Sequence, residues 1–344
     1  MKILYFGNKL SKHGYTPTTV ENLGCLLQSE QLEVHTSSDK KNKLVRFLDM
    51  VIFFFRNRKE ADAILIDTYS TLNFWYAVVI GRLASLYGIK YIPILHGGKL
   101  PERLDRSAAI SHRLFMHSAV NVAPSAYLHE AFCKRGYLNT VIIPNFIDEG
   151  NYIPLYRYSI GTPRLLWVRS FSDIYNPQMA IHVLAEVRRI YPEASLLMIG
   201  GCNGEDECFR QTRLLANSLG LSDAVEFTGK LSKSEWITRS TECNVFINTT
   251  NADNTPVSVI EAMALGFPVV STNVGGIPYI ITNEENGLLV ESGSVEAMAH
   301  SIVRVVKDSA LCTRLSQTSV ETSRKYSSIA VKESWLSLLG KMIE

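Results

Sequence analysis

Two carboxylates frame a short apolar stretch of the sequence, DNTPVSVIEAMALGFPVV, which covers residues 253–270. Thr255 and Pro256 predict a helix start, a capping hydroxyl followed by a proline at the first helical position. Asp253 precedes this helix, and Glu261 lies beside its apolar side. The free N–H groups of a first helical turn attract anions, and carboxylates accept hydrogen bonds from hydroxyls. The combination suits a sugar nucleotide, with phosphates at the helix start and diols on the carboxylates.

A plainer interpretation fits the same stretch. Glu261 is then a solvated residue at the edge of the helix, and Asp253 is an ordinary loop residue. Burying a carboxylate without partners is costly, so Glu261 is either exposed or in contact with hydrogen-bond donors. The stretch by itself leaves both interpretations open.

Further polar side chains stand at the ends of predicted strands. Arg169 directly follows LLWV, where a guanidinium can neutralise a departing diphosphate. His96 follows KYIPIL and precedes two glycines, so it either reaches a substrate or bonds a loop carbonyl. Asp67 and Thr68 end another strand, and with Lys99 they are candidate contacts to an acceptor.

The first strand leads into the loop GNKLSKHGYTPTT, which contains Gly14 and ends at a predicted helix start. Such a loop can receive an acceptor or a diphosphate. It is not a dinucleotide fingerprint, because the pattern G-x-G-x-x-G is absent.

Short apolar runs alternate with helical patterns along the whole chain, which predicts parallel sheets covered on both faces. We therefore expect an α/β protein with two doubly wound domains. The predicted division is residues 1–155, residues 156–326 and a C-terminal helix, 327–344, that packs back towards the first domain. Ligands of open parallel sheets bind beyond the carboxyl ends of the strands, so we expect the site in a cleft between the domains.

The composition is that of a soluble globular protein: 344 residues, 46% of them apolar and 20% charged, with a net charge of +2. No apolar run is long enough to span a bilayer, and MKILYFGN does not resemble a signal peptide. The six scattered cysteines favour reduced thiols over a zinc site. We expect a cytoplasmic protein that binds no nucleic acid.

Positive charge is concentrated in the first half, where residues 1–150 contain 18 Lys and Arg against 13 Asp and Glu. The stretch 40–59, KKNKLVRFLDMVIFFFRNRK, combines basic residues with bulky apolar ones. This pattern favours contact with the inner face of a membrane, although a core helix with basic ends gives the same pattern.

The segment from Asp253 to Val290 resembles the donor-binding segment of family-4 glycosyltransferases, which have the GT-B fold of two Rossmann-like domains facing each other across a cleft. The family pattern is a Glu, seven residues, Glu-Ala-Met-Ala-x-Gly-x-Pro-Val-Val, Gly-Gly-Ile-Pro and Asn-Gly-Leu-Leu-Val. Here the two acids are Asp253 and Glu261. Weaker correspondences extend over nearly the whole chain, at Gly14, His96, Ser125, Asn145, Arg169 and Gly200.

The resemblance implies a role for each matching residue. Glu261 would bind the ribose, Asp253 and His96 the transferred sugar, and Arg169 the diphosphate. The N–H groups of the helix start would also hold the diphosphate; this stretch comprises Thr255, Pro256, Val257 and Ser258. It further implies a retaining reaction, no metal and no cofactor, with a UDP-sugar as the favoured co-substrate.

The sequence departs from the family at two positions. The family pairs the Arg with a Lys five residues later, where this chain has Ile174. Asn176, a possible helix cap, or Lys230, at another strand end, are the candidate substitutes for that cation. The second departure is Asp253, which is one methylene shorter than the family's Glu.

These observations predict a hexosyl- or N-acetylhexosaminyl-transferase that acts on a glycan or lipid-linked acceptor in surface polysaccharide biosynthesis. Two alternatives remain. One is a catalytically silent member that binds a nucleotide sugar or a partner, which the missing Lys favours. The other is an epimerase acting on a nucleotide sugar.

Overall fold

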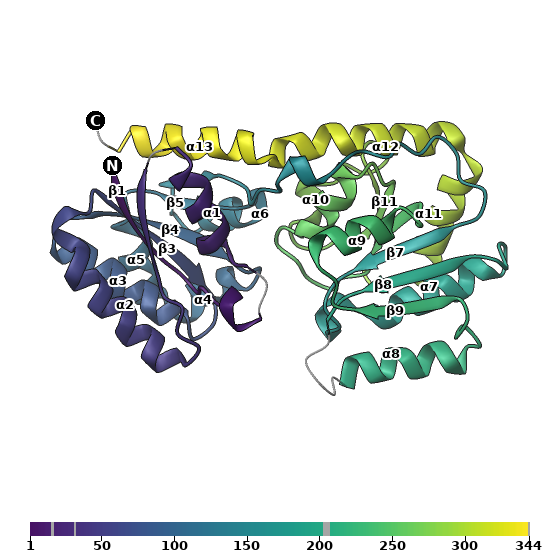
Figure 1. Cartoon of the computed structure of the whole chain (residues 1–344), viewed down its shortest axis with the longest axis horizontal. Helices are drawn as coiled ribbons and strands as arrows, with labels where there is room; N and C mark the ends of the chain where they lie inside the picture. Colours follow the sequence, from purple (N-terminus) through teal and green to yellow (C-terminus); the bar gives the residue numbers. More distant parts are fainter. Residues whose placement is uncertain (15–16, 31, 202–206, 343–344) are drawn as a thin grey trace. The chain divides into compact units, whose positions relative to one another are not determined.

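The computed structural model describes residues 1–14, 17–30, 32–201 and 207–342 (Figure 1). The chain forms two compact units, one comprising Met1–Asn145 with Ser328–Glu344 and the other Phe146–Ser327. Each unit contains one six-stranded sheet in which the neighbouring strands pair in parallel. The prediction of an α/β fold built from two doubly wound sheets is confirmed.

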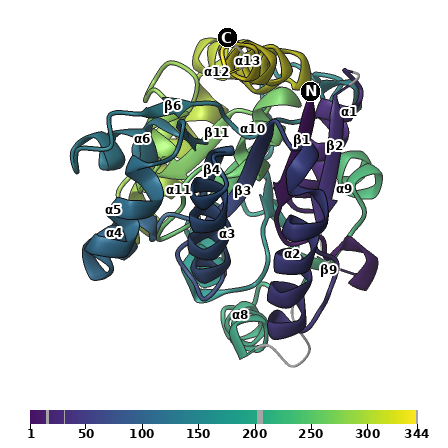
Figure 2. The same cartoon turned by 90° about the vertical axis from the view of Figure 1, so that its left-hand side faces the viewer.

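The sheet of the first unit has the strand order β2-β1-β3-β4-β5-β6. Its strands are β1 (Lys2–Phe6), β2 (Glu33–Ser37), β3 (Ala63–Tyr69), β4 (Lys90–His96), β5 (Asn121–Ala123) and β6 (Thr140–Ile142). Its helices are α1 (Thr19–Gln28), α2 (Lys43–Asn57), α3 (Phe74–Leu86), α4 (Leu100–Arg106), α5 (Ala108–Met116), α6 (Ala126–Cys133) and α13 (Ser328–Gly340). Helices α2 and α3 pack side by side over the sheet (Figure 2).

The sheet of the second unit has the order β12-β11-β10-β7-β8-β9. Its strands are β7 (Arg164–Val168), β8 (Ser195–Ile199), β9 (Val225–Gly229), β10 (Val245–Asn248), β11 (Val269–Thr272) and β12 (Leu288–Val290). Its helices are α7 (Pro177–Arg188), α8 (Glu207–Ser218), α9 (Lys233–Ser240), α10 (Val257–Ala264), α11 (Val295–Lys307) and α12 (Ser309–Ser323).

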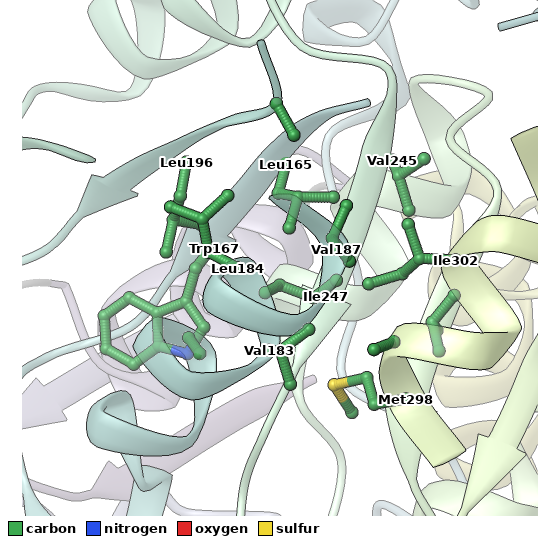
Figure 3. Close-up of a cluster of buried hydrophobic side chains, with 14 of the residues drawn as sticks. Leu165, Trp167, Val183, Leu184, Val187, Leu196, Val245, Ile247, Met298 and Ile302 are labelled. Atoms are coloured by element: carbon green, nitrogen blue, oxygen red, sulfur yellow. The ribbon is translucent and has the colours of Figure 1, made fainter. Parts of the chain in front are cut away.

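The two faces of this second sheet carry separate cores, as the alternation of side chains along a strand requires. On β7, Leu165 and Trp167 pack with α7 and α11 (Figure 3), whereas Leu166 packs with α10. Because α10 buries nearly its whole surface, its position relative to the strand ends is tightly fixed.

The boundary between the units lies after Asn145, ten residues before the predicted division at residue 155. The intervening segment packs on the second unit, where the Leu155 N–H donates to the carbonyl of Leu265 at 3.1 Å. Just beyond the segment, the buried Arg157 guanidinium donates to the same carbonyl at 2.8 Å and lies over the ring of Phe267 at 3.6 Å. At the other end of the chain, Lys332 of α13 pairs with Glu30 at 2.7 Å, within the first unit.

Candidate active site

The candidate site of the second unit begins where two neighbouring strands end. Arg169 directly follows β7, and Asp253 lies in the loop that follows β10, the strand paired with β7. The two side chains form an ion pair, and both are largely buried. The guanidinium also lies 4.8 Å from the centre of the Tyr175 ring. Parallel strand ends therefore bring these two predicted residues together.

Hydrogen bonds join the loops that carry this ion pair. The Trp167 indole N–H donates to the Thr249 hydroxyl at 3.0 Å, and this hydroxyl donates to the Tyr175 carbonyl at 2.8 Å. The Asn251 N–H donates to the carbonyl of Ile174 at 2.8 Å. We call residues 249–256, the loop between β10 and α10 that contains Asp253, the acidic loop. Ile174, which replaces the family's Lys, thus supports the acidic loop through its backbone.

A glycine pair, Gly275 and Gly276, lets a second loop approach the acidic loop. The Gly276 N–H donates to the Asp253 carbonyl at 3.0 Å. A Cβ atom on Gly276 would lie 1.7 Å from the carbonyl oxygen of Asn254, and one on Gly275 would lie 2.0 Å from that of Asp253. A side chain at either position would displace the loop that holds the Asp253 carboxylate.

Helix α10 begins one residue later than predicted, at Val257, and Pro256 is its N-cap. The predicted N-cap, Thr255, lies one position before the observed N-cap, Pro256, which has no side-chain acceptor. The first turn therefore presents the N–H groups of Val257 and Ser258, which make no bond within the helix. Among the described residues, the Ser258 hydroxyl and the Arg169 Nε are buried without a hydrogen-bond partner. These unpaired donors are what an anion at this helix start would bind.

Glu261 of α10 is only 5% exposed, so the solvated interpretation is wrong. Its Oε1 atom accepts a hydrogen bond of 2.7 Å from the Tyr152 hydroxyl and forms an ion pair with Lys233. Burial and the Glu261 charge raise the pKa of Tyr152 well above its usual value, so this hydroxyl is a permanent donor. Sequence reasoning missed both partners. Tyr152 lies 109 residues away in the sequence, and no local pattern connects it with Glu261.

The two candidate substitutes for the missing Lys have different surroundings. Asn176 caps α7, as predicted, because its side chain accepts a bond of 3.3 Å from the Met179 N–H. Lys230 follows β9, and its Cβ lies close to Gly201, at the end of the neighbouring strand β8. The sequence did not single out Lys233, the cation nearest to Glu261.

In the first unit, the predicted residues gather at the carboxyl ends of β3 and β4. Asp67 is fully buried, and its Oδ1 atom accepts bonds of 2.9 Å from the Tyr5 hydroxyl and from His96 Nε2. The His96 ring stacks on Tyr69 with 4.8 Å between ring centres. Burial and the Asp67 charge raise the pKa of Tyr5 far above its usual value. Asp67 therefore contacts His96 directly.

The other predicted residues of this unit are Thr68, Gly14 and Lys99. Thr68 is fully buried, and its hydroxyl donates to the carbonyl of Ile66 at 3.0 Å. Gly14 ends a short 3₁₀ turn with a φ of 82°, a conformation that favours glycine. Lys99 immediately precedes α4.

The described residues contain no group of three or more His, Cys, Asp and Glu side chains placed to hold a metal ion. Within the same residues, no helix has the length and apolar character needed to cross a membrane.

Comparisons with known proteins concern the family and the fold of the chain. Residues 160–322 match the family model described as glycosyl transferases group 1. The lipopolysaccharide core biosynthesis glycosyltransferase LpsE of Rhizobium meliloti is 28% identical over 200 residues, which cover 58% of this chain and 57% of that protein. The chain spans about half the length of the curated relatives it matches.

Two solved structures share the fold of the whole chain. Sucrose-phosphate synthase (tll1590) from Thermosynechococcus elongatus has a TM-score of 0.81 at 17% identity, over 100% of this chain and 99% of that one. Anabaena Alr3699/HepE, solved in complex with UDP, has a TM-score of 0.79 at 17% identity, over 99% and 100% of the two chains. The prediction of a GT-B fold is confirmed, and residues 160–322, which contain Arg169, Asp253 and Glu261, form a domain of the glycosyl transferases group 1 family.

Proposed function

We propose that the chain transfers a sugar from a nucleotide diphosphate sugar to a hydroxyl group of a glycan or lipid-linked acceptor, with retention of configuration. The observation that carries this proposal is the pairing of Arg169 with Asp253 beside the free first turn of α10. Cationic and backbone donors there suit a diphosphate, and a carboxylate suits sugar hydroxyls. The buried Glu261, four helical positions beyond Val257, adds an acceptor for the ribose.

The proposed reaction follows from these contacts. The bond between the sugar C1 and the diphosphate oxygen breaks, and a bond from C1 to the acceptor oxygen forms. Arg169 has five N–H donors, of which one nitrogen engages Asp253, so Nε remains for a phosphate oxygen as negative charge develops. The departing phosphate accepts the proton of the acceptor hydroxyl. Asp253 and His96 orient the sugar.

UDP-sugars are the first donors to test, because HepE binds UDP in a related fold. The proposal includes a metal-independent reaction without a cofactor, and hexose or N-acetylhexosamine as the transferred sugar. Glycan assembly at a cell surface would then supply the acceptor, which LpsE's role in lipopolysaccharide core biosynthesis also favours.

The test is titration calorimetry with UDP-, GDP- and ADP-sugars, followed by an assay for transfer to glycan acceptors. We expect one nucleotide to bind, and Arg169→Ala to abolish transfer. Arg189→Ala is the matched control, because Arg189 lies at the end of α7 and pairs with Glu186 of that helix. Binding without transfer or donor hydrolysis would favour the silent member that Ile174 suggests, and donor conversion without an acceptor would favour the epimerase.

A specific observation supports a second proposal, that α2 binds the inner face of a membrane. Leu44, Leu48, Ile52 and Phe55 are exposed at helical spacing, in a single row. The basic residues at the two ends of the helix are Lys40, Lys41, Lys43, Arg56, Arg58 and Lys59. Arg46 does not belong to this surface, because it is buried and donates to the carbonyl of Lys40 at 3.0 Å. Apolar and basic residues together suit anionic lipid.

Flotation with anionic and neutral vesicles tests the membrane proposal. We expect wild-type protein to float with phosphatidylglycerol vesicles, and Leu48→Glu to remain in solution. Leu138→Glu is the control, since Leu138 is even more exposed but lies outside α2. Equal flotation of all three proteins would contradict the proposal.

A further inference from the structure

Glu261 is held by two side chains from outside its own helix. Tyr152 belongs to the segment that precedes β7, and Lys233 is the first residue of α9. Both act on the same carboxylate oxygen, Oε1. A carboxylate has four acceptor positions, so the second oxygen, Oε2, remains available to a ligand.

We infer that Tyr152 and Lys233 are positioning residues that fix the Glu261 carboxylate so that Oε2 binds the ribose diol. The inference rests on the proposed function, because it concerns the nucleotide of that same site. Rotation of the carboxylate about its terminal bond would break both contacts at once. The ammonium also compensates the charge of a carboxylate that is almost fully buried. A single geometry therefore persists before the nucleotide arrives, which reduces the entropy lost on binding.

The two positioning residues are themselves well supported. Tyr152 is buried, and its ring centre lies 6.4 Å from that of Trp236. The Lys233 ammonium lies 5.8 Å and 5.5 Å from the centres of these two rings. The first turn of α9 is fixed by a capping box in which the Ser232 N–H donates to Glu235 at 2.8 Å. The aromatic surroundings and the cap together restrict the position of Lys233.

A positioning role predicts a selective defect. A hydrogen bond to a charged group contributes about tenfold to binding affinity. Removal of a positioning residue should therefore weaken binding by about this factor, and only for ligands that carry the ribose diol. A purely structural role would instead weaken all nucleotides alike. The ratio of affinities for a nucleoside diphosphate and its 2′,3′-dideoxy analogue separates these cases.

The experiment uses calorimetry on the full chain with UDP, GDP and ADP, then with the dideoxy form of the one that binds. Tyr152→Phe removes only the hydroxyl, Lys233→Met removes the ammonium, and Lys233→Arg should restore the ion pair. We expect the first two variants to lose about tenfold in affinity for the ribose form and less than about twofold for the dideoxy form. Lys233→Arg should bind as wild type does. Tyr158→Phe, at an exposed tyrosine of the same segment, is the matched control.

Two results would overturn the inference while leaving the proposed function intact: equal losses for both nucleotides, or no loss in either variant. Melting temperatures of each variant, measured without ligand, show whether it has folded. If wild-type protein binds none of the three diphosphates, the proposed function fails and the inference fails with it.

Discussion

Gly276 offers the sharpest test of how the acidic loop is positioned. Its φ of −86° is an ordinary value that alanine also adopts, so Gly276→Ala introduces no backbone strain. The only change is a methyl group whose carbon would lie 1.7 Å from the Asn254 carbonyl oxygen. Non-bonded carbon and oxygen atoms need roughly 3.3 Å, so the loop must move by about 1.6 Å.

A displacement of this size has two expected consequences. Overpacking at a buried position costs about 1–3 kcal/mol of folding stability, which leaves a typical domain folded. A misplacement of about 1 Å in a catalytic group costs about 100-fold in rate, and Asp253 is the residue directly before Asn254. We therefore expect Gly276→Ala to fold but to transfer sugar about 100-fold more slowly than wild type.

The assay measures nucleotide release in the presence of donor and acceptor, together with the melting temperature. Gly161→Ala is the matched control, because a Cβ atom there meets no atom within 4 Å. This control should keep wild-type turnover. A folded Gly276→Ala protein with wild-type turnover would refute the argument that the glycine pair sets the position of the Asp253 carboxylate.

Three further predictions follow from single side chains. Ile174→Lys should raise affinity for the nucleoside diphosphate about fivefold at low salt, because the site gains a cation. Ile174 is 38% exposed, so salt should screen the added charge and the gain should be smaller at high salt. Calorimetry at two ionic strengths measures the change. Asp67→Asn should slow sugar transfer about tenfold, because Asp67 forms a hydrogen bond with His96. The double variant Asp67→Asn, His96→Ala should be no slower than His96→Ala alone. Burial raises the pKa of the Cys243 thiol to about 12, against roughly 8.5 in an unfolded chain. The folded state thus holds this proton longer, so its stabilising contribution is complete below pH 8.5 or so and declines as the pH rises towards 12. Urea unfolding from pH 8 upwards should show a shallower alkaline decline in Cys243→Ala, by up to about 1.4 kcal/mol per pH unit, and no such change in Cys25→Ala, where the thiol is exposed.

The sequence predicted those parts of the structure that depend on local pattern. The alternation of short apolar runs with helical patterns predicted parallel sheets, and both sheets are parallel. Strand β2 lies at an edge of its sheet and is only partly buried, and it has no continuous apolar run. Arg169 and Asp253 could be predicted to meet because parallel strands that pair end at the same edge.

The contacts that sequence could not predict join residues far apart in the chain. Neither Tyr152 nor Lys233 belongs to a recognisable motif, yet both bind Glu261. The start of α10 was misplaced for a different reason. A threonine before a proline is a common helix start, but here the chain turns at Pro256.

The polar groups of the site are held in place by protein partners before a ligand binds. These partners leave some hydrogen-bond donors and acceptors of the same groups unpaired. Asp253 engages one nitrogen of Arg169 and leaves Nε unpaired. Tyr152 and Lys233 engage one oxygen of Glu261. The hydroxyl of Ser258 is buried without a partner among the described residues. Unpaired buried groups cost folding free energy, and a ligand with phosphates and hydroxyls would supply the missing partners of the Arg169 Nε and the Ser258 hydroxyl.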